Sequence, residues 1–193
     1  MPVVAPPRLF ASVEYWRAIA NSDAPAINAA ERYDKRCKAA HRYEIVDVRG
    51  RLSLTVPIAK PHGVENPTWA DCPVSTHDEW WRRHRTALES AYGRTPYFEF
   101  LIDKFNCIFR SPEEWDRWPS ILDLIRVSNG IICDILYFDR HLEYVGRLAD
   151  FEPPTTPLPA YWQVRQHIHG FQPGLSILDL IFNLGPEAAM YIR

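Results

Sequence analysis

Apolar and polar residues alternate most clearly between residues 42 and 58, on either side of Arg49-Gly50. A period of two is typical of a strand with one buried face, and a glycine between two such runs is typical of a tight turn. The pattern therefore predicts a β-hairpin over residues 42–58. Shorter apolar runs predict further strands at residues 3–5, 26–29 and 131–138.

Helical spacing of apolar residues fills the intervals between these strands. It predicts a first helix over about 9–21 and a long helix from Thr76 to about Tyr92, where Glu79 completes a capping box. A main helix is expected over about 119–128, because Gly130 follows and glycine is typical of a helix end. The remaining helices are expected near 96–109, 161–171 and 175–188.

The order of these elements predicts the fold class. A strand, a helix and a second strand open the chain, which is compatible with a parallel βαβ unit, whereas the hairpin is antiparallel. We expect a helix-rich α/β fold, or a mixed α+β one, with a small, partly parallel sheet and C-terminal helices. Residues 1–193 are expected to form one domain with proline-rich loops at 60–75 and 150–159. Loops as long as the first are usually functional or mobile.

Composition narrows the classes of partner. The chain has 193 residues, 47% hydrophobic and 24% charged, which is the usual balance of a globular protein. A formal net charge of -2 makes nucleic acid an unexpected partner, because phosphate neutralisation usually requires a basic excess. Local basic clusters at 32–38 and 82–85 nevertheless favour a smaller anion, such as a nucleotide, a sugar nucleotide or an amino acid. The oligomeric state is not predicted.

Cysteine spacing and hydropathy indicate the cellular compartment. The four cysteines lie far apart without a Cys-x-x-Cys motif, which argues against zinc and against a disulfide framework. We expect no metal and no cofactor. The first ten residues lack the features of a signal peptide, and the longest apolar run, 131–138, is too short to span a bilayer. A cytoplasmic protein without membrane insertion is expected.

Several strings resemble the WbqC-like protein family, and they occur in the same order along the chain. The most specific string lies near the C-terminal end, in YWQV at 161–164, GF at 170–171 and LSILDLIFNLGPE at 175–187. The other matching strings are VEYW at 13–16, ERYDK at 31–35, LTVPI at 54–58 and WWRRHRTALESAYGRTPYFE at 80–99. One departure is Ala40-His41-Arg42, which stands where the family carries Arg-Asn-Arg.

The resemblance implies a bacterial cytoplasmic protein of surface-polysaccharide metabolism. It implies a transferase-like activity on activated sugars or their amino groups, without defining a reaction. The opening strand, turn, helix and strand also resemble nucleotidyltransferase-like Rossmann domains, in which a helix N-terminus holds phosphates. The first turn here, APPRLFASVEYW, has neither the histidine nor the glycine-rich loop of those domains.

Candidate site residues cluster after the second predicted strand. Ligands of open α/β sheets usually bind beyond the carboxyl ends of the strands. Glu31 and His41 are candidate general bases, because a carboxylate or an imidazole there could transfer protons. Candidate substrate-binding residues are cations that could clamp an anion, aromatic groups, and one histidine, namely Tyr15, Tyr33, Lys35, Arg36, Arg42, Trp81 and His84. The alternative is a solvated loop with weak surface ion pairs, and aromatic and histidine side chains that build the core.

Asp179 and Asn183 are candidate structural residues. They lie four apart on one stripe of the most apolar predicted helix. A carboxylate in such a segment must be paired, so we expect Asp179 to accept hydrogen bonds from a buried arginine or from helix-start amides.

Two hypotheses of function follow from these patterns. The first is an enzyme-like domain that binds a nucleotide- or sugar-linked anion in a cleft. The second is a non-catalytic binding or assembly protein that uses the 60–75 loop and exposed aromatic residues. A cleft in which Tyr15, Glu31, Lys35 and His41 converge would favour the first hypothesis.

Overall fold

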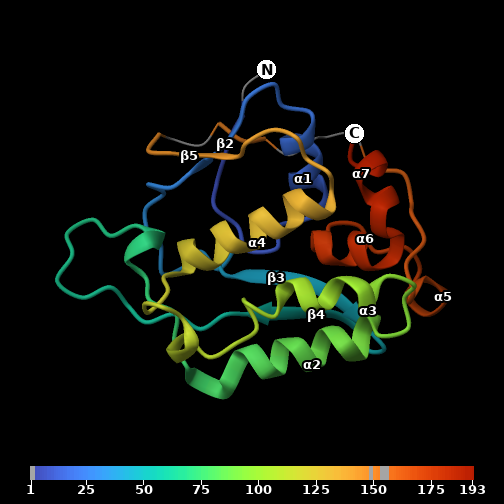
Figure 1. Ribbon diagram of the computed structural model, residues 1–193, viewed down its shortest axis with the longest axis horizontal. Coiled ribbons are helices and arrows are strands. Elements are labelled where there is room, and N and C mark those ends of the chain that lie inside the picture. The colour runs from blue at the N-terminus through green and yellow to red at the C-terminus, as the bar shows by residue number, and fades with distance from the viewer. Residues whose placement is uncertain (1–2, 148–149, 153–156) are drawn as a thin grey trace.

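A three-stranded parallel sheet lies at one side of the molecule (Figure 1). The computed structural model describes residues 3–147, 150–152 and 157–193. The strands β1 (Val3–Ala5), β2 (Pro25–Asn28) and β5 (Glu143–Val145) pair in the order β1-β2-β5. β2 is central and fully buried, as expected of a strand paired on both edges.

The first crossover in this sheet is the helix α1 (Val13–Ala20) between β1 and β2. Pro6 and Pro7 end β1, because proline has no N–H for the ladder. Ser12 then caps α1 by accepting a hydrogen bond from the backbone N–H of Tyr15 at 3.3 Å. The expected strand–helix–strand unit and the partly parallel sheet are therefore confirmed.

The predicted hairpin forms a second, separate sheet of β3 (Arg42–Asp47) and β4 (Gly50–Thr55). Its register pairs Arg42 with Thr55 at the open end and Asp47 with Gly50 at the turn. The helix α2 (Trp80–Tyr92) lies along one side of the hairpin, and α6 (Ile177–Leu184) packs on β3 from the other side (Figure 1). The mixed α/β fold with an antiparallel pair is confirmed.

The helix α4 (Ile121–Ile135) corrects two expectations. The helix does not end at Gly130, and residues 131–138 do not form a strand. Ser120 and Asp123 form a reciprocal capping box at its start, and Ile125, Ile132 and Ile135 on one face are buried. These contributions outweigh the cost of a glycine inside a helix, about 1 kcal/mol.

Three further segments differ from expectation. The fifth strand is β5, whose three residues are too few to show a period. Thr76 does not cap a helix, because residues His77–Glu79 form a 3₁₀ turn in which Asp78 and Glu79 have φ of 60° and 43°. Only α5 (Gln166–His169) is helical within 161–171.

The remaining elements are short. Residues Phe98–Leu101 form α3, and Ala188–Tyr191 form α7, which confirms the expected C-terminal helices together with α6. Four more 3₁₀ helices complete the described chain, at Trp69–Asp71, Ile102–Phe105, Pro112–Glu114 and Gly185–Glu187. The proline-rich connection 150–159 lies partly outside the described residues, and its described parts form no helix or strand.

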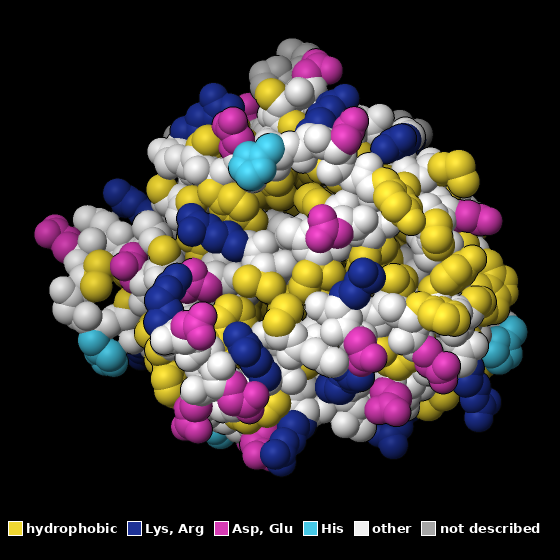
Figure 2. Space-filling view, viewed as in Figure 1, with side chains coloured by type: hydrophobic (Ala, Val, Ile, Leu, Met, Phe, Trp, Pro, Cys, Tyr) yellow, Lys and Arg dark blue, Asp and Glu magenta, His cyan; other side chains and the backbone are white. Residues whose placement is uncertain are grey.

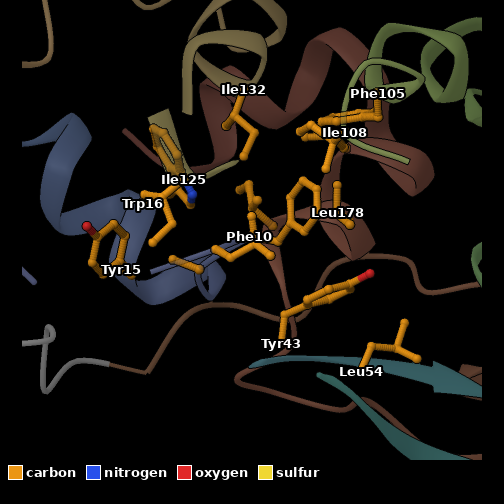
Figure 3. Packing of buried hydrophobic residues seen from close by; sticks show 14 of the residues in the cluster. Phe10, Tyr15, Trp16, Tyr43, Leu54, Phe105, Ile108, Ile125, Ile132 and Leu178 are labelled. Carbon is orange, nitrogen blue, oxygen red and sulfur yellow. The ribbon is translucent and has the colours of Figure 1, made fainter. Parts of the chain in front are cut away.

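One apolar core joins the two sheets (Figure 3). Phe10, from the turn after β1, lies edge-on to Tyr43 of the hairpin with ring centroids 4.9 Å apart, and edge-on to Phe105 at 5.7 Å. All residues of α6 from Ile177 to Asn183 are buried, so this helix lies inside the core. The core therefore holds the turn after β1 against both β3 and α6.

Candidate functional site

A hollow of about 310 Å³ opens beside the turn that follows β1, where the carboxyl ends of the parallel strands lie. We call it the sheet-edge hollow. Its walls come from the turn after β1, the start of α1, the first residues of β3, the segment after β5, and the start of α6. The lining includes Arg8, Ser12, Tyr15, Arg42, Tyr43, Glu44, Phe151 and Ser176. This is the edge at which open α/β sheets usually bind ligands.

Two helix N-termini meet at this hollow. Ser12 is the N-cap of α1 and Ser176 is the N-cap of α6, and both line it. The two starts are joined by hydrogen bonds from Val13 N to Leu175 O at 3.1 Å and from Ile177 N to Ala11 O at 2.8 Å. Each helix start carries a partial positive charge, so their meeting favours an anion.

The charged side chains around the hollow leave one cation without a carboxylate partner. Arg8 Nη1 donates to Glu31 Oε2 at 2.9 Å, so that pair is neutral. Glu44 accepts from Arg51 Nη1 at 2.7 Å. Arg42 donates through Nε to Thr55 Oγ1 at 2.8 Å and forms no ion pair with any described residue. Of the two cations that line the hollow, Arg42 is thus the one without an ion pair, and Glu14 places a carboxylate at the rim, where its Oε1 accepts from Gly174 N at 3.0 Å.

Aromatic rings form a second wall of the hollow. Tyr15 and Phe151 lie with ring centroids 4.9 Å apart, and the Tyr15 hydroxyl donates to Pro6 O at 2.8 Å. Burial raises the pKa of Tyr15 far above its ordinary value, so its hydroxyl stays neutral. The hollow therefore combines a cationic end with a neutral, apolar flank.

The chain matches the model of the WbqC-like protein family over residues 7–156, which is 150 of its 193 residues. The chain belongs to this family. No curated protein and no solved structure gives a significant match. The matched range contains Arg8, Tyr15 and Arg42 of this WbqC-like protein, and it ends before the 161–187 string and before Ser176.

Of the residues predicted from sequence, Tyr15 and Arg42 line the sheet-edge hollow. Glu31 does not line the hollow. Its Oε2 accepts from Arg8 Nη1, and also from Trp69 Nε1 at 2.8 Å. His41 is 3% exposed, and its Nδ1–H donates to Val56 O at 2.6 Å. Burial lowers the pKa of His41, so the ring is neutral near pH 7. The WbqC-like protein thus holds both candidate bases in structural contacts.

The other predicted substrate-binding residues lie away from this hollow. Tyr33 packs edge-on against Trp69 with ring centroids 5.3 Å apart. Lys35 and Arg36 are exposed and do not line the hollow. Trp81 packs against Trp80. The convergence of Glu31, Lys35 and His41 with Tyr15 that sequence reasoning required is therefore absent, and the functional roles of these residues stay predictions.

His84 lines a different hollow of about 370 Å³ between β4 and α2. Its Nδ1 lies 3.1 Å from the hydroxyl of Tyr43, which lines the sheet-edge hollow. Burial lowers the pKa of His84 to about 4, so the imidazole is neutral near pH 7 and accepts from that hydroxyl. The Tyr43–His84 pair thereby connects the walls of the two hollows of this WbqC-like protein.

Sequence reasoning missed Arg8, Ser12, Phe151 and Ser176. Arg8 directly follows the two prolines that end β1, which is a signal for the carboxyl end of a strand. Ser176 precedes an apolar helix and stands three positions before Asp179, which is a helix-start signal. No local pattern shows that the helix starts at Ser12 and Ser176 meet, because these residues lie at opposite ends of the chain.

Asp179 is completely buried, as the apolar pattern predicts, but its partners differ from expectation. Its Oδ2 accepts from the Tyr161 hydroxyl at 2.5 Å and from Gln163 Nε2 at 2.9 Å, and no arginine of the described ranges forms a hydrogen bond or ion pair with it. Asn183 Nδ2 donates to the backbone oxygen of Asp179 at 2.7 Å. Burial raises the pKa of Asp179, and the bonds from Tyr161 and Gln163 oppose that rise. Hydroxyl and amide donors thus replace the expected arginine or helix-start amides.

The described residues show neither a metal cluster nor a membrane-spanning helix. Within the described ranges, no three His, Cys, Asp or Glu side chains are grouped so that they could hold a metal ion. Nor does that part of the chain contain a helix with the length and hydrophobicity needed to cross a membrane.

Proposed function

We propose that this WbqC-like protein binds a small anionic molecule, linked to a nucleotide or a sugar, in the sheet-edge hollow. The observation that carries the proposal is the position of Arg42, which has no carboxylate partner, beside the meeting N-termini of α1 and α6. A cation and two helix starts attract the same oxyanion, because each carries positive charge or partial positive charge.

The shape of the hollow supports one orientation of the ligand. The anionic group lies at Arg42 and the capped helix starts, and the ring of the sugar or base lies against Tyr15 and Phe151. The volume of about 310 Å³ is at the lower end of the range for small-molecule sites, roughly 300–1,000 Å³. That size favours a single phosphorylated sugar or nucleoside over a dinucleotide.

Within this proposal, the reaction class is transfer from an activated sugar to a hydroxyl or amine of surface-polysaccharide metabolism. Arg42 and the helix starts would stabilise the charge that develops on the departing phosphate oxygen. The four cysteines are all free thiols, which supports a cytoplasmic location, because cytoplasmic thiols stay reduced. Binding is the first step to test, since it does not depend on the identity of a general base.

The test is a thermal-shift screen of nucleotide sugars, nucleotides and amino acids, followed by calorimetric titration of each hit. Arg42→Gln should weaken a hit at least tenfold, because one charge-assisted contact contributes about 1.5–3 kcal/mol. Arg94→Gln is the matched control, since Arg94 is exposed and does not line the hollow. A screen without any stabilising ligand, or an equal loss in Arg94→Gln, would contradict the proposal.

The second candidate function is binding or assembly through the 60–75 loop. Residues 62–66 are exposed, and the loop projects from the left of the view in Figure 1. Its second half is anchored, because Trp69 is buried and Val74 O accepts from Trp118 Nε1 at 2.7 Å. Trp118 is itself 49% exposed, so an aromatic surface adjoins the loop. Trp118→Ser should abolish partner binding and leave small-molecule binding unchanged if this second function holds.

A further inference from the structure

A further hollow, of about 570 Å³, lies between residues 110–117 and the first half of α4. We call it the arginine hollow. It shares no lining residue with the sheet-edge hollow. Its lining includes three arginines, one tryptophan and one carboxylate, namely Arg110, Arg117, Arg126, Trp115 and Asp123. Figure 2 shows basic and acidic side chains gathered over this end of α4, at the left of the view.

Arg110 is held in place without a carboxylate. Its guanidinium carbon lies 4.9 Å from the centroid of the Trp115 ring. Its Nε is buried and has no hydrogen-bond partner, and the side chain forms no ion pair with any described residue. A stacked guanidinium keeps its N–H groups in a fixed plane, so less freedom is lost when they bind an oxyanion.

Arg126 repeats this arrangement on α4. Its guanidinium carbon lies 4.9 Å from the centroid of the Tyr144 ring of β5. Asn129 Nδ2 lies 3.1 Å from the Tyr144 hydroxyl and so fixes that ring. In the described part of the chain, Arg126 also lacks an ion pair. Arg110 and Arg126 are thus both positioned by aromatic rings, and Arg126 lines the arginine hollow as well as a neighbouring hollow of about 450 Å³ that Tyr144 lines.

Both oxygens of the Asp123 carboxylate, which lines the hollow, accept hydrogen bonds from protein groups. Asp123 Oδ1 accepts from Arg117 Nη2 at 2.6 Å, and its Oδ2 accepts from the backbone N and the hydroxyl of Ser120, both at 2.8 Å. Burial raises the pKa of Asp123, but the bonds from Arg117 and Ser120 outweigh it and lower the pKa below its usual value. Asp123 is therefore ionised and neutralises Arg117 alone.

The charge balance of the arginine hollow is positive. Arg110, Arg117 and Arg126 face two carboxylates, Asp116 and Asp123, so one positive charge is in excess. Asp116 is exposed, where water screens it. An anion that bridges Arg110 and Arg126 would restore neutrality.

We propose that the arginine hollow is a second ligand site, which binds a small molecule through a phosphate group held by Arg110 and Arg126. Phosphate suits two separate forks better than a single carboxylate does, because it presents three oxygens. The hollow is larger than a lone phosphate requires and lies within the range of small-molecule sites, roughly 300–1,000 Å³. The remainder of the ligand lies against Trp115, Pro119 and Val127.

The test is a nuclear magnetic resonance titration of the whole chain with pyrophosphate, with citrate and sulfate as comparison anions. Pyrophosphate should shift the Trp115 indole N–H and the Val127 amide in a saturable manner. Arg126→Gln, an exposed position that should not affect folding, should weaken this binding at least tenfold. Arg110→Gln should weaken it similarly.

Two control variants separate this site from general charge and from the sheet-edge hollow. Arg94→Gln and Arg42→Gln should both leave the pyrophosphate affinity measured at Trp115 within twofold. The assignment is overturned if no saturable shift occurs at Trp115 and Val127, or if Arg94→Gln weakens binding as much as Arg126→Gln. Citrate binding in place of pyrophosphate would overturn the choice of phosphate. Failure of Arg42→Gln to affect nucleotide-sugar binding would bear on the proposed function alone.

Discussion

Replacement of Glu31 tests whether this carboxylate supports the site or acts as its base. One oxygen, Oε2, accepts from Arg8 Nη1 at 2.9 Å and from Trp69 Nε1 at 2.8 Å. Arg8 lines the sheet-edge hollow, whereas Trp69 belongs to the anchored half of the 60–75 loop. Glu31 therefore joins the site to the loop, and we expect its main contribution to be to stability.

The two contacts contribute differently. The side chains of Arg8 and Glu31 are 20% and 26% exposed, so their ion pair contributes roughly 0.5–1 kcal/mol. Trp69 is 1% exposed, and loss of its acceptor leaves a buried N–H unpaired at a cost of about 1–3 kcal/mol. Glu31→Ala should thus lower the free energy of unfolding by about 1.5–4 kcal/mol. Glu31→Gln keeps an acceptor for Trp69 and should cost about 1 kcal/mol or less.

Urea unfolding followed by circular dichroism measures both variants, and calorimetry measures their ligand affinity. The reasoning is refuted if Glu31→Ala and Glu31→Gln destabilise equally, because the contact with Trp69 would then contribute nothing. A general base predicts a different pattern. In that case Glu31→Gln would retain stability and ligand binding but would lose turnover of any substrate found in the screen.

Two further predictions concern the C-terminal helices. Gly185→Ala should destabilise by about 2–5 kcal/mol in a urea titration, because φ of +54° strains an L-residue and the new Cβ would fall on the Tyr97 ring. Tyr97→Ala in the same chain should remove the steric part of this loss, and full additivity of the two changes would contradict the clash. The second variant is Asp179→Asn. Burial raises the pKa of the Asp179 carboxyl in the folded wild-type protein. The wild-type protein therefore loses stability as pH rises from the unfolded pKa, about 3.9, through the raised folded-state pKa. The free energy of unfolding of the Asn variant minus that of wild type should therefore increase between pH 4 and pH 8, and a flat difference would exclude Asp179 as the source.

Local patterns predicted those parts of the fold that depend on local interactions. The hairpin has a period of two on both sides of its glycine, and the residues that pair are close in sequence. α4 could not be bounded in this way, because the capping box and the buried face of the whole helix outweigh the single glycine inside it. The helix predicted over 161–171 was wrong for most of its length, because Tyr161 and Gln163 donate hydrogen bonds to Asp179 instead. No local spacing reveals these contacts.

The site shows the same division. Tyr15 and Arg42 were found because one follows the first turn and the other begins the hairpin. The second helix start, at Ser176, and the ring of Phe151 come from distant segments and reach the hollow only through the folded core. Glu31 and His41 lie in the predicted region, but hydrogen bonds from Arg8 and Trp69 hold Glu31 and burial encloses His41, and residue type alone does not reveal such contacts.

The strand order β1-β2-β5 has a consequence for how the chain folds. Ala26 pairs with Glu143, and the hairpin and the helices α2 to α4 lie between these two residues in the sequence. Chains dominated by such distant pairing fold slowly, because loop closure precedes the contacts that reward it. During synthesis on the ribosome, the edge of β2 that pairs with β5 has no partner strand until about three quarters of the polypeptide has been made. Nascent chains truncated before β5 should therefore need chaperones more than full-length chains do.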